Sequence, residues 1–409
     1  MRIAALVGAL WVSAAAAAQD AKKQDPPRFH AGVDQKRVNQ AIQRGIKFLK
    51  TSDSPGNYMS AHCDELILLT FVHAGVEESE PRFKELLDKV MKAPLERTYN
   101  VALQAMVLEE LDRVRHQARI HQCAQFLADN QCTNGQWSYG SPTTYSEAVP
   151  VPPPTRDVAT GRKPTAASRP KGAIDFDAPL EGPRPKPRVV KFLSVKQNRD
   201  GGGSGDNSNS QYAALGIRAC HDAGIVFPKE MIERAKKYWV DSQHKGPDKG
   251  PREAVATGGA GVPRGWSYHE ENEGPAWGSM TAGAVGAVCI YDAILGTDWK
   301  KDKSVLDGIA WMAKNFSVTE NPHHGKLWHY YYLYALERVG MLYDTQRIGA
   351  HDWYLQGANR FLEEQRADGS WGSEERLDKP AWGTCFAILF LKQATRRLID
   401  VASVDPLKK

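Results

Sequence analysis

Hydrophobic and polar positions along the chain alternate between two kinds of predicted helix. One kind is amphipathic, as in residues 229–238 (KEMIERAKKY), where charged side chains share the helix with apolar ones at helical spacing. The other kind is apolar almost all round, as in residues 64–74 (DELILLTFVHA) and 281–289 (TAGAVGAVC). A helix that is apolar on every side must be buried, whereas an amphipathic helix lies at a surface. The pattern therefore predicts two concentric layers with the apolar helices inside.

The two kinds of helix recur as pairs, which indicates an internal repeat. Apolar inner helices are predicted at residues 64–75, 99–111, 209–224, 279–295, 328–339 and 384–395. Their amphipathic partners contain residues 45–49, 83, 126–127, 238–239, 306–316 and 357–362. Stacked helix pairs bury a continuous core, and six pairs that close on themselves form an all-α (α/α)6 toroid. Residues 189–197 follow the same plan without its tryptophan, and we interpret them as a degenerate outer helix.

A Gln-x3-Gly-x-Trp turn links the two helices in the clearest copies. It occurs at residues 131–137 and 365–371, and an expanded version joins Gln243 to Trp266. A tryptophan is large enough to stack over the start of the following helix, and a glutamine can bond backbone groups left free at a helix end. We expect these turns to tie neighbouring repeats together.

The two ends and the middle of the chain differ from the repeats. Arg2 followed by an apolar run over residues 3–18 is typical of a signal peptide, and the run is short for a membrane span. We expect cleavage near Ala18 and export to a periplasmic or extracellular location. Residues 19–36 are then a flexible segment, 37–395 the toroid domain, 141–190 a Pro-rich insertion within it, and 396–409 a tail.

Composition narrows the classes of function. Hydrophobic residues make up 42% of the 409 residues and charged residues 25%, which is typical of a globular protein. The net charge of +5 is too small and too scattered to indicate nucleic-acid binding. Six cysteines occur without a CxxC pair, so no structural zinc site is predicted. Cys123 and Cys132 are the pair that export would allow to form a disulfide, and the sequence leaves their state open.

The Gln…Gly-x-Trp turns at residues 131–137 and 365–371 resemble the QW repeats of squalene-hopene cyclases and other terpene cyclases. That superfamily also includes protein prenyltransferase β-subunits and complement thioester domains. The resemblance implies the toroid fold and an apolar, isoprenoid-like ligand. It does not extend to the residues that carry activity: the chain has no DxDD acid motif, no GCGEQ-like thioester run, and no Asp-x-Cys to join His323, His324 and His329 as a zinc site.

Three carboxylates stand where the resemblance places a catalytic acid, at the start of an inner helix. Asp64 and Glu65 form an adjacent pair, and Asp206 stands alone before Asn207. Acid catalysis needs a carboxyl group kept protonated by burial or like charge. The structural alternatives are a favourable interaction of Asp64 and Glu65 with the helix dipole and an N-cap role for Asp206.

Aromatic side chains gather near the predicted starts of the inner helices and suggest a ligand-binding belt at the mouth of the ring. The belt comprises Trp266, Tyr268, Trp277, His329, Tyr330, Tyr331 and Trp382, with Tyr332 beside them. Such a belt can bind an isoprenoid or stack on sugar rings. The alternative is core packing between the helix layers.

These observations favour a binding or scaffolding protein that holds an apolar, isoprenoid-like ligand or a protein partner at the toroid mouth, with no cofactor and no metal. The alternative is an enzyme. One version is a divergent terpene cyclase that uses Asp64 or Glu65. Another is a polysaccharide lyase or hydrolase, for which Glu270, Glu271 and Glu273 supply carboxylates.

Overall fold

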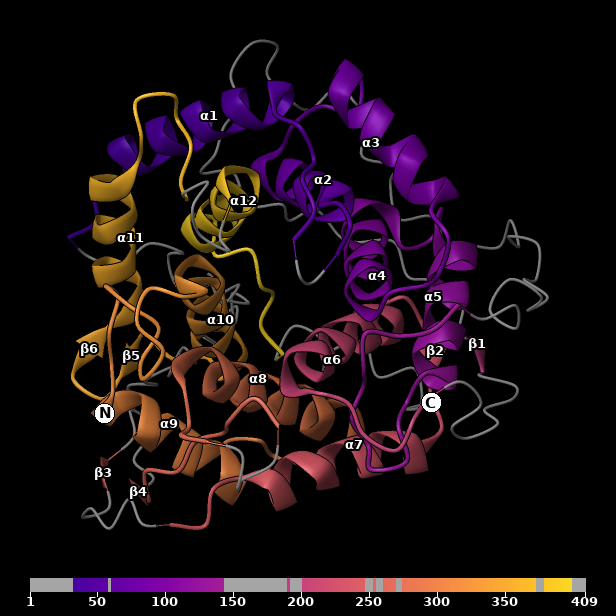
Figure 1. Ribbon diagram of the computed structural model, residues 1–409, viewed down its shortest axis with the longest axis vertical. Coiled ribbons are helices and arrows are strands. Elements are labelled where there is room, and N and C mark those ends of the chain that lie inside the picture. Colours follow the sequence, from indigo (N-terminus) through magenta and orange to yellow (C-terminus); the bar gives the residue numbers. More distant parts are fainter. Residues whose placement is uncertain are drawn as a thin grey trace, which may run out of the picture.

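The computed structural model describes residues 32–57, 60–142, 190–191, 201–246, 253–254, 260–269, 274–372 and 379–398. In this part of the chain twelve α-helices alternate between an outer and an inner layer (Figure 1). The outer helices are α1 (Gln35–Thr51), α3 (Pro81–Lys92), α5 (Gln117–Asp129), α7 (Lys229–Ser242), α9 (Lys303–Lys314) and α11 (Trp353–Glu364). The inner helices are α2 (Asp64–Ala74), α4 (Thr98–Asp112), α6 (Asn207–Asp222), α8 (Gly278–Leu295), α10 (His329–Leu342) and α12 (Pro380–Leu391). The prediction of six helix pairs is confirmed.

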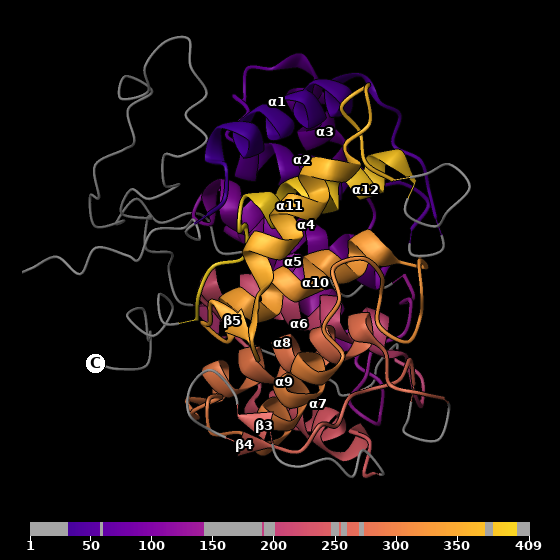
Figure 2. The same ribbon diagram turned by 90° about the vertical axis from the view of Figure 1, so that its left-hand side faces the viewer.

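The inner helices form a closed ring. Each packs against the next along the chain, and the last of them, α12, packs against the first, α2. Seen from the side, the helices run between the two faces of the ring (Figure 2). The all-helical toroid predicted from the pattern is therefore the observed fold.

Burial follows the two hydrophobic patterns. All 11 residues of α2 and all 12 residues of α12 are buried. In the outer helix α3 only Phe83, Leu86 and Val90 are buried, at the i, i+3, i+7 spacing of one helix face. An inner helix touches neighbours on every side, whereas an outer helix has one face in water.

Local signals in the sequence fix where helices start and stop. The inner helices α2 and α8 end at Gly75 and Gly296, whose φ angles of 73° and 74° are in the left-handed region. Glycine adopts this region without the strain of a Cβ atom. The inner helix α6 begins after Asp206, whose side chain accepts a hydrogen bond from the backbone N–H of Asn209.

Small residues let the inner helices approach closely. A Cβ atom at Gly216 of α6 would lie 2.8 Å from the Cα atom of Ala102 in α4. Contact at that distance is possible only without a side chain, so Gly216 sets the separation of these two helices.

The Gln–Trp turns, residues 131–137, 243–266 and 365–371, make the same bonds in three places. Gln131 Nε2 donates to the carbonyl oxygen of Met231 at 3.0 Å, and Gln243 Nε2 donates to that of Ser304 at 3.0 Å. Gln365 Nε2 donates to that of Ala41 at 2.8 Å. Each glutamine thus reaches from the end of one outer helix to the next outer helix around the ring.

The tryptophans of these turns bond backward along the chain. The indole N–H of Trp137 donates to Leu127 O at 2.7 Å, and that of Trp371 donates to Phe361 O at 2.8 Å. Trp266 does the same to Trp239 O at 2.8 Å. The expectation that the turns join neighbouring repeats agrees with these bonds.

The described residues also include six short strands outside the helices. β1 (Val190–Lys191) pairs in parallel with β2 (Ile225–Val226), and β3 (Glu253–Ala254) pairs with β4 (Ala260–Gly261) in antiparallel fashion. β5 (Arg347–Ile348) and β6 (His351–Asp352) are also antiparallel. Of the predicted degenerate helix at residues 189–197, only β1 is described. The predicted signal peptide, residues 143–189 of the insertion and residues 399–409 lie outside the described residues.

One described helix, α8, has the length and apolarity that a membrane crossing requires. It is an inner helix of the ring, and 83% of it is buried inside the protein.

Candidate functional site

The amino-terminal ends of the inner helices meet on one face of the ring, which we call the mouth. The backbone N–H of Gly278, which opens α8, donates to Pro322 O in the loop before α10 at 2.9 Å. The backbone N–H of Asn207, which opens α6, donates to Tyr268 O at 2.9 Å. The loops of different repeats are thus bonded to one another at the mouth.

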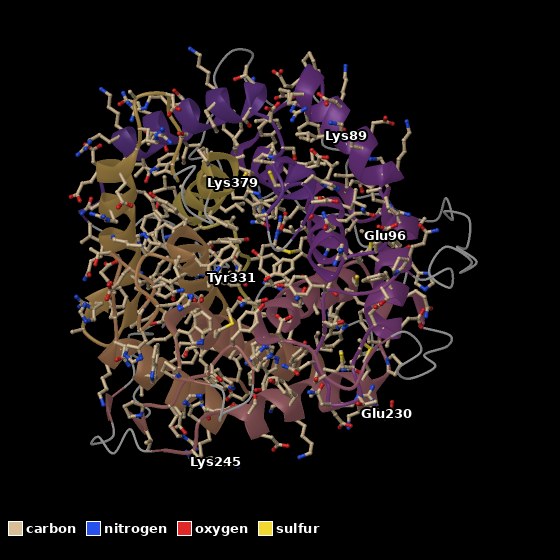
Figure 3. The ribbon with its side chains drawn as sticks, in the orientation of Figure 1. Lys89, Glu96, Glu230, Lys245, Tyr331 and Lys379 are labelled. Carbon is tan, nitrogen blue, oxygen red and sulfur yellow. The ribbon has the colours of Figure 1, made fainter. Side chains whose placement is uncertain are left out.

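Tyrosines from three inner helices meet within the ring below the mouth. The hydroxyl groups of Tyr99 in α4 and Tyr331 in α10 lie 3.2 Å apart. The rings of Tyr99 and Tyr212 have centroids 4.4 Å apart, and Tyr212 stacks on Tyr331 at 5.9 Å. Tyr331 lies near the middle of the ring (Figure 3). Burial raises the pKa of Tyr99 and Tyr331 well above the ordinary value, so both remain neutral hydroxyls.

A charged side chain from α10 lies deeper in the ring. The Arg338 guanidinium is 4.5 Å from the centroid of the Tyr334 ring and 5.4 Å from that of Tyr212. It donates to Gln211 Oε1 at 2.8 Å. This buried cation is held by aromatic faces and an amide oxygen, an arrangement that fixes the register of α6 against α10.

Half-buried aromatic residues lie above the tyrosines. We call Tyr268, Trp277, His324 and Trp328 the mouth cluster. Tyr268 packs on Trp277 with centroids 5.7 Å apart, and Trp277 packs on His324 at 3.8 Å. Trp328, the residue before α10, lies 6.2 Å from Tyr331 between centroids. All four side chains are partly exposed.

Hydroxyl groups join the mouth cluster to the tyrosines. The Ser208 hydroxyl lies 3.1 Å from Tyr268 Oη and also bonds the Tyr99 hydroxyl. Tyr139 Oη lies 3.3 Å from Tyr268 Oη. The Tyr268 hydroxyl therefore already has polar neighbours within the protein.

Most of the other residues of the predicted aromatic belt contact neighbouring elements. The Trp382 indole donates to Pro55 O at 2.8 Å, and His329 Nε2 lies 3.0 Å from Val318 O. Tyr330 stacks on Phe361 of the outer helix α11. Trp266 belongs to a Gln–Trp turn and is buried between the layers. Of the predicted belt, Tyr268 and Trp277 are therefore the members of the mouth cluster, and Tyr331 lies beneath it.

The predicted carboxylates fall in two separate places. Asp206 caps α6: its Oδ1 accepts from Asn209 N at 2.8 Å and its Oδ2 from Asn209 Nδ2 at 2.8 Å. Asp64 and Glu65 open α2 and line a different pocket, together with His62. The structure thus brings Asp64 and Glu65 together and leaves Asp206 at another helix start.

Glu65 is the most buried of the three, at 1% exposure. Its Oε2 accepts from Asn100 Nδ2 at 2.8 Å, and Asn100 Oδ1 accepts from Ser60 Oγ at 2.6 Å. His62 Nδ1 lies 3.4 Å from Glu65 Oε2 and 3.5 Å from Asp64 Oδ2. The Glu65 carboxylate, followed by that of Asp64, raises the pKa of His62, which favours an imidazolium between the two acids.

The remaining candidates have structural surroundings. His323 Nδ1 lies 3.0 Å from Ala276 O, and its Nε2 lies 3.1 Å from Asn315 Oδ1. Within the described ranges, no three His, Cys, Asp or Glu side chains come together as a metal would require. All six cysteines, Cys123 and Cys132 included, are free and buried. Residues 270–273, with the three glutamates of the glycan alternative, lie outside the described residues.

Sequence reasoning missed Tyr99, Tyr212 and Trp328. Tyr99 and Tyr212 fall within the first six residues of their inner helices, as Tyr331 does. Alignment of the inner helices by their starts would have indicated an aromatic layer. Trp328 has a φ angle of 55°, a backbone conformation that no local signal in the sequence announces.

No protein-family model and no curated protein matches this chain. Among solved structures, two of the type II terpene cyclase MstE from Scytonema, both in complex with geranylgeranyl dihydroxybenzoate, are similar at 12% identity. Each match covers 88% of this chain and 97% of the other, with TM-scores of 0.47 and 0.46.

Proposed function

We propose that this protein binds an apolar small molecule of isoprenoid type at the mouth of the toroid. The observation that carries the proposal is the mouth cluster, in which Tyr268, Trp277 and Trp328 offer partly exposed rings beside the starts of α8 and α10. Neighbouring aromatic side chains that are partly exposed are typical of surfaces that contact a ligand or a partner.

The surroundings of the cluster favour an apolar ligand over a polar one. Leu327, next to Trp328, is 48% exposed and is among the few large hydrophobic side chains exposed on the described surface. The Tyr268 hydroxyl already bonds Ser208 and Tyr139. A ligand that packs on these rings gains apolar contact without displacing a bond.

The ligand is expected to lie at the mouth and above the tyrosines. Tyr99, Tyr212 and Tyr331 are each 1–3% exposed and contact one another across the ring. An extended chain would therefore lie along Trp277 and Trp328, with Tyr331 as the floor.

A binding titration with geranylgeraniol as the isoprenoid probe tests this proposal. We expect saturable binding by the wild type and at least a tenfold loss of affinity in Trp277→Ala and Trp328→Ala. Each substitution removes a ring whose burial against the ligand would contribute about 1.5–3 kcal/mol to the free energy of binding. Trp299→Ala is the matched control, because Trp299 is also half-buried but follows the carboxyl-terminal end of α8. Equal affinity in all three variants would refute the site.

The enzyme alternative has one observation in its favour, the buried pair of Asp64 and Glu65 with His62 at 3.4 Å from the Glu65 carboxylate. A proton donor of this kind would act on an alkene such as squalene. Unchanged turnover of squalene after Asp64→Asn and Glu65→Gln would remove this candidate.

We also propose that the protein works outside the cytoplasm. The support is the sequence of residues 1–18, with Arg2 before a short apolar run. A mouth that collects an apolar molecule is consistent with a carrier in an exported compartment.

A further inference from the structure

A second hollow lies away from the mouth cluster, between α2 and the end of the outer helix α3. It has a volume of about 340 Å³ and is lined by His62, Asp64 and Glu65 on one side. Asp88, Lys89, Val90 and Lys92 of α3, with Ala93 and Pro94 after it, line the other side. Lys89 lies on the outer layer of the ring (Figure 3). The size is near the lower end of the range for small-molecule sites.

Two carboxylate oxygens in this hollow have no hydrogen-bond partner. They are Asp64 Oδ1 and Glu65 Oε1, and both atoms are buried. Glu65 is 1% exposed and Asp64 8% exposed, so both residues are more than nine-tenths buried. A buried carboxylate oxygen without a donor is costly, so the arrangement calls for a donor from outside.

The charge of the hollow indicates what kind of donor fits. His62 Nδ1 lies 3.4 Å from Glu65 Oε2 and 3.5 Å from Asp64 Oδ2, so it faces the other oxygen of each carboxylate and leaves Asp64 Oδ1 and Glu65 Oε1 without a donor. The lysines are engaged on the exposed side: Lys89 pairs with Glu85 at 2.8 Å and Lys92 with Asp88 at 2.7 Å. The deep end of the hollow is thus acidic.

A metal ion fits the hollow poorly. Divalent cations take six or more oxygen ligands or a tetrahedral set of nitrogen and sulfur ligands. Here no cluster of three metal-binding side chains occurs among the described residues. An organic cation needs only donors directed at two oxygens, which Asp64 and Glu65 supply.

We propose that this hollow, the acidic pocket, binds a small molecule through a protonated primary amine, with its N–H groups donating to Asp64 Oδ1 and Glu65 Oε1. The proposal is independent of the apolar site, because it rests on different residues and a different ligand chemistry.

Calorimetric titration of the mature protein with putrescine and with 1,4-butanediol tests the proposal. The two probes have the same four-carbon chain, but only putrescine carries ammonium groups. We expect saturable binding of putrescine and none of the diol. Asp64→Asn and Glu65→Gln should each weaken putrescine binding about tenfold to a hundredfold, since a hydrogen bond to a charged group contributes about 1.5–3 kcal/mol.

Asp88→Asn is the matched control, because Asp88 lines the same pocket but is exposed and paired with Lys92. We expect it to bind putrescine within about twofold of the wild type. Equal affinity for the diol, tighter binding of Ca²⁺ than of putrescine, or wild-type affinity in both Asp64→Asn and Glu65→Gln would each overturn the proposal. If Glu65→Gln fails to fold, Asp64→Asn and the comparison of the two probes decide the question.

Discussion

Gln365 Nε2 donates a hydrogen bond to the carbonyl oxygen of Ala41 at 2.8 Å, across 324 positions of the chain. This bond joins the last outer helix, α11, to the first, α1, and so closes the outer layer of the ring. The same amide donates to Gly369 O at 2.9 Å, and its oxygen accepts from the Arg44 guanidinium. One side chain therefore connects the first and the last helix pair of the ring.

Gln365→Ala should lower the free energy of unfolding by about 1–3 kcal/mol, because it leaves the Ala41 carbonyl and the Arg44 guanidinium without this partner. Urea unfolding followed by circular dichroism measures the change. Gln122→Ala is the control, since Gln122 only accepts from Arg119 three residues away on α5. Similar losses in both variants would show that ring closure does not depend on Gln365.

Trp371→Phe should destabilise the protein by about 2–3 kcal/mol, because the buried Phe361 carbonyl loses the indole N–H at 2.8 Å. Trp299→Phe removes an indole whose N–H has no hydrogen-bond partner. When both variants are unfolded in urea, Trp299→Phe should lower the free energy of unfolding by less than half as much as Trp371→Phe. If the two substitutions were equivalent, the indole bond would have no special role.

Glu337 of α10 gives stability a dependence on pH. It is fully buried and accepts from Thr395 N at 2.9 Å and Thr395 Oγ1 at 2.7 Å. Burial raises the pKa of Glu337 from 4.5 to about 7. Between these values the folded protein retains a proton that the unfolded chain releases, so the free energy of unfolding should fall as pH rises from 4.5 to 7.

Thermal unfolding at intervals from pH 4.5 to 8 measures this contribution. Glu337→Gln should flatten the profile over that window relative to wild type, because the amide does not titrate. Glu320→Gln, on the exposed surface, should leave the profile unchanged. If the stability of the wild type and that of Glu337→Gln changed by the same amount between pH 4.5 and 7, the assignment would be contradicted.

Export predicts a shortened chain. When the full sequence is produced in a cell with a secretion pathway, intact mass spectrometry should detect a mature protein that begins at Gln19 in the exported fraction. Replacement of the apolar residues Leu6 and Leu10 by Arg should keep the protein in the cytoplasm at full length. Full-length protein in the exported fraction would indicate a retained leader.

The sequence predicted the helix layers and the Gln–Trp turns because both depend on local pattern. The apolar helices read as buried, and Gln131 and Trp137 act within one turn and its nearest neighbours. Trp266 was assigned to the belt although it follows a Gly in a Gln–Trp turn. That position indicates the buried role the structure gives it.

The site was harder to predict because it combines residues from distant repeats. Tyr99 meets Tyr331 only when the register of α4 and α10 across the ring is known. The adjacent pair of Asp64 and Glu65 was recognisable from sequence, but the opposite wall of their pocket comes from Lys89 on α3. No spacing rule links these two helix ends.

Photocrosslinking tests the central claim, that an apolar ligand lies on the mouth cluster. The mature protein would be labelled with a diazirine-bearing geranylgeranyl probe, digested and analysed by mass spectrometry. Labelling should concentrate on residues 266–277 and 324–332 and fall when unlabelled geranylgeraniol competes. Labelling spread over the outer helices, or confined to residues 62–65 and 88–94, would contradict binding at the mouth.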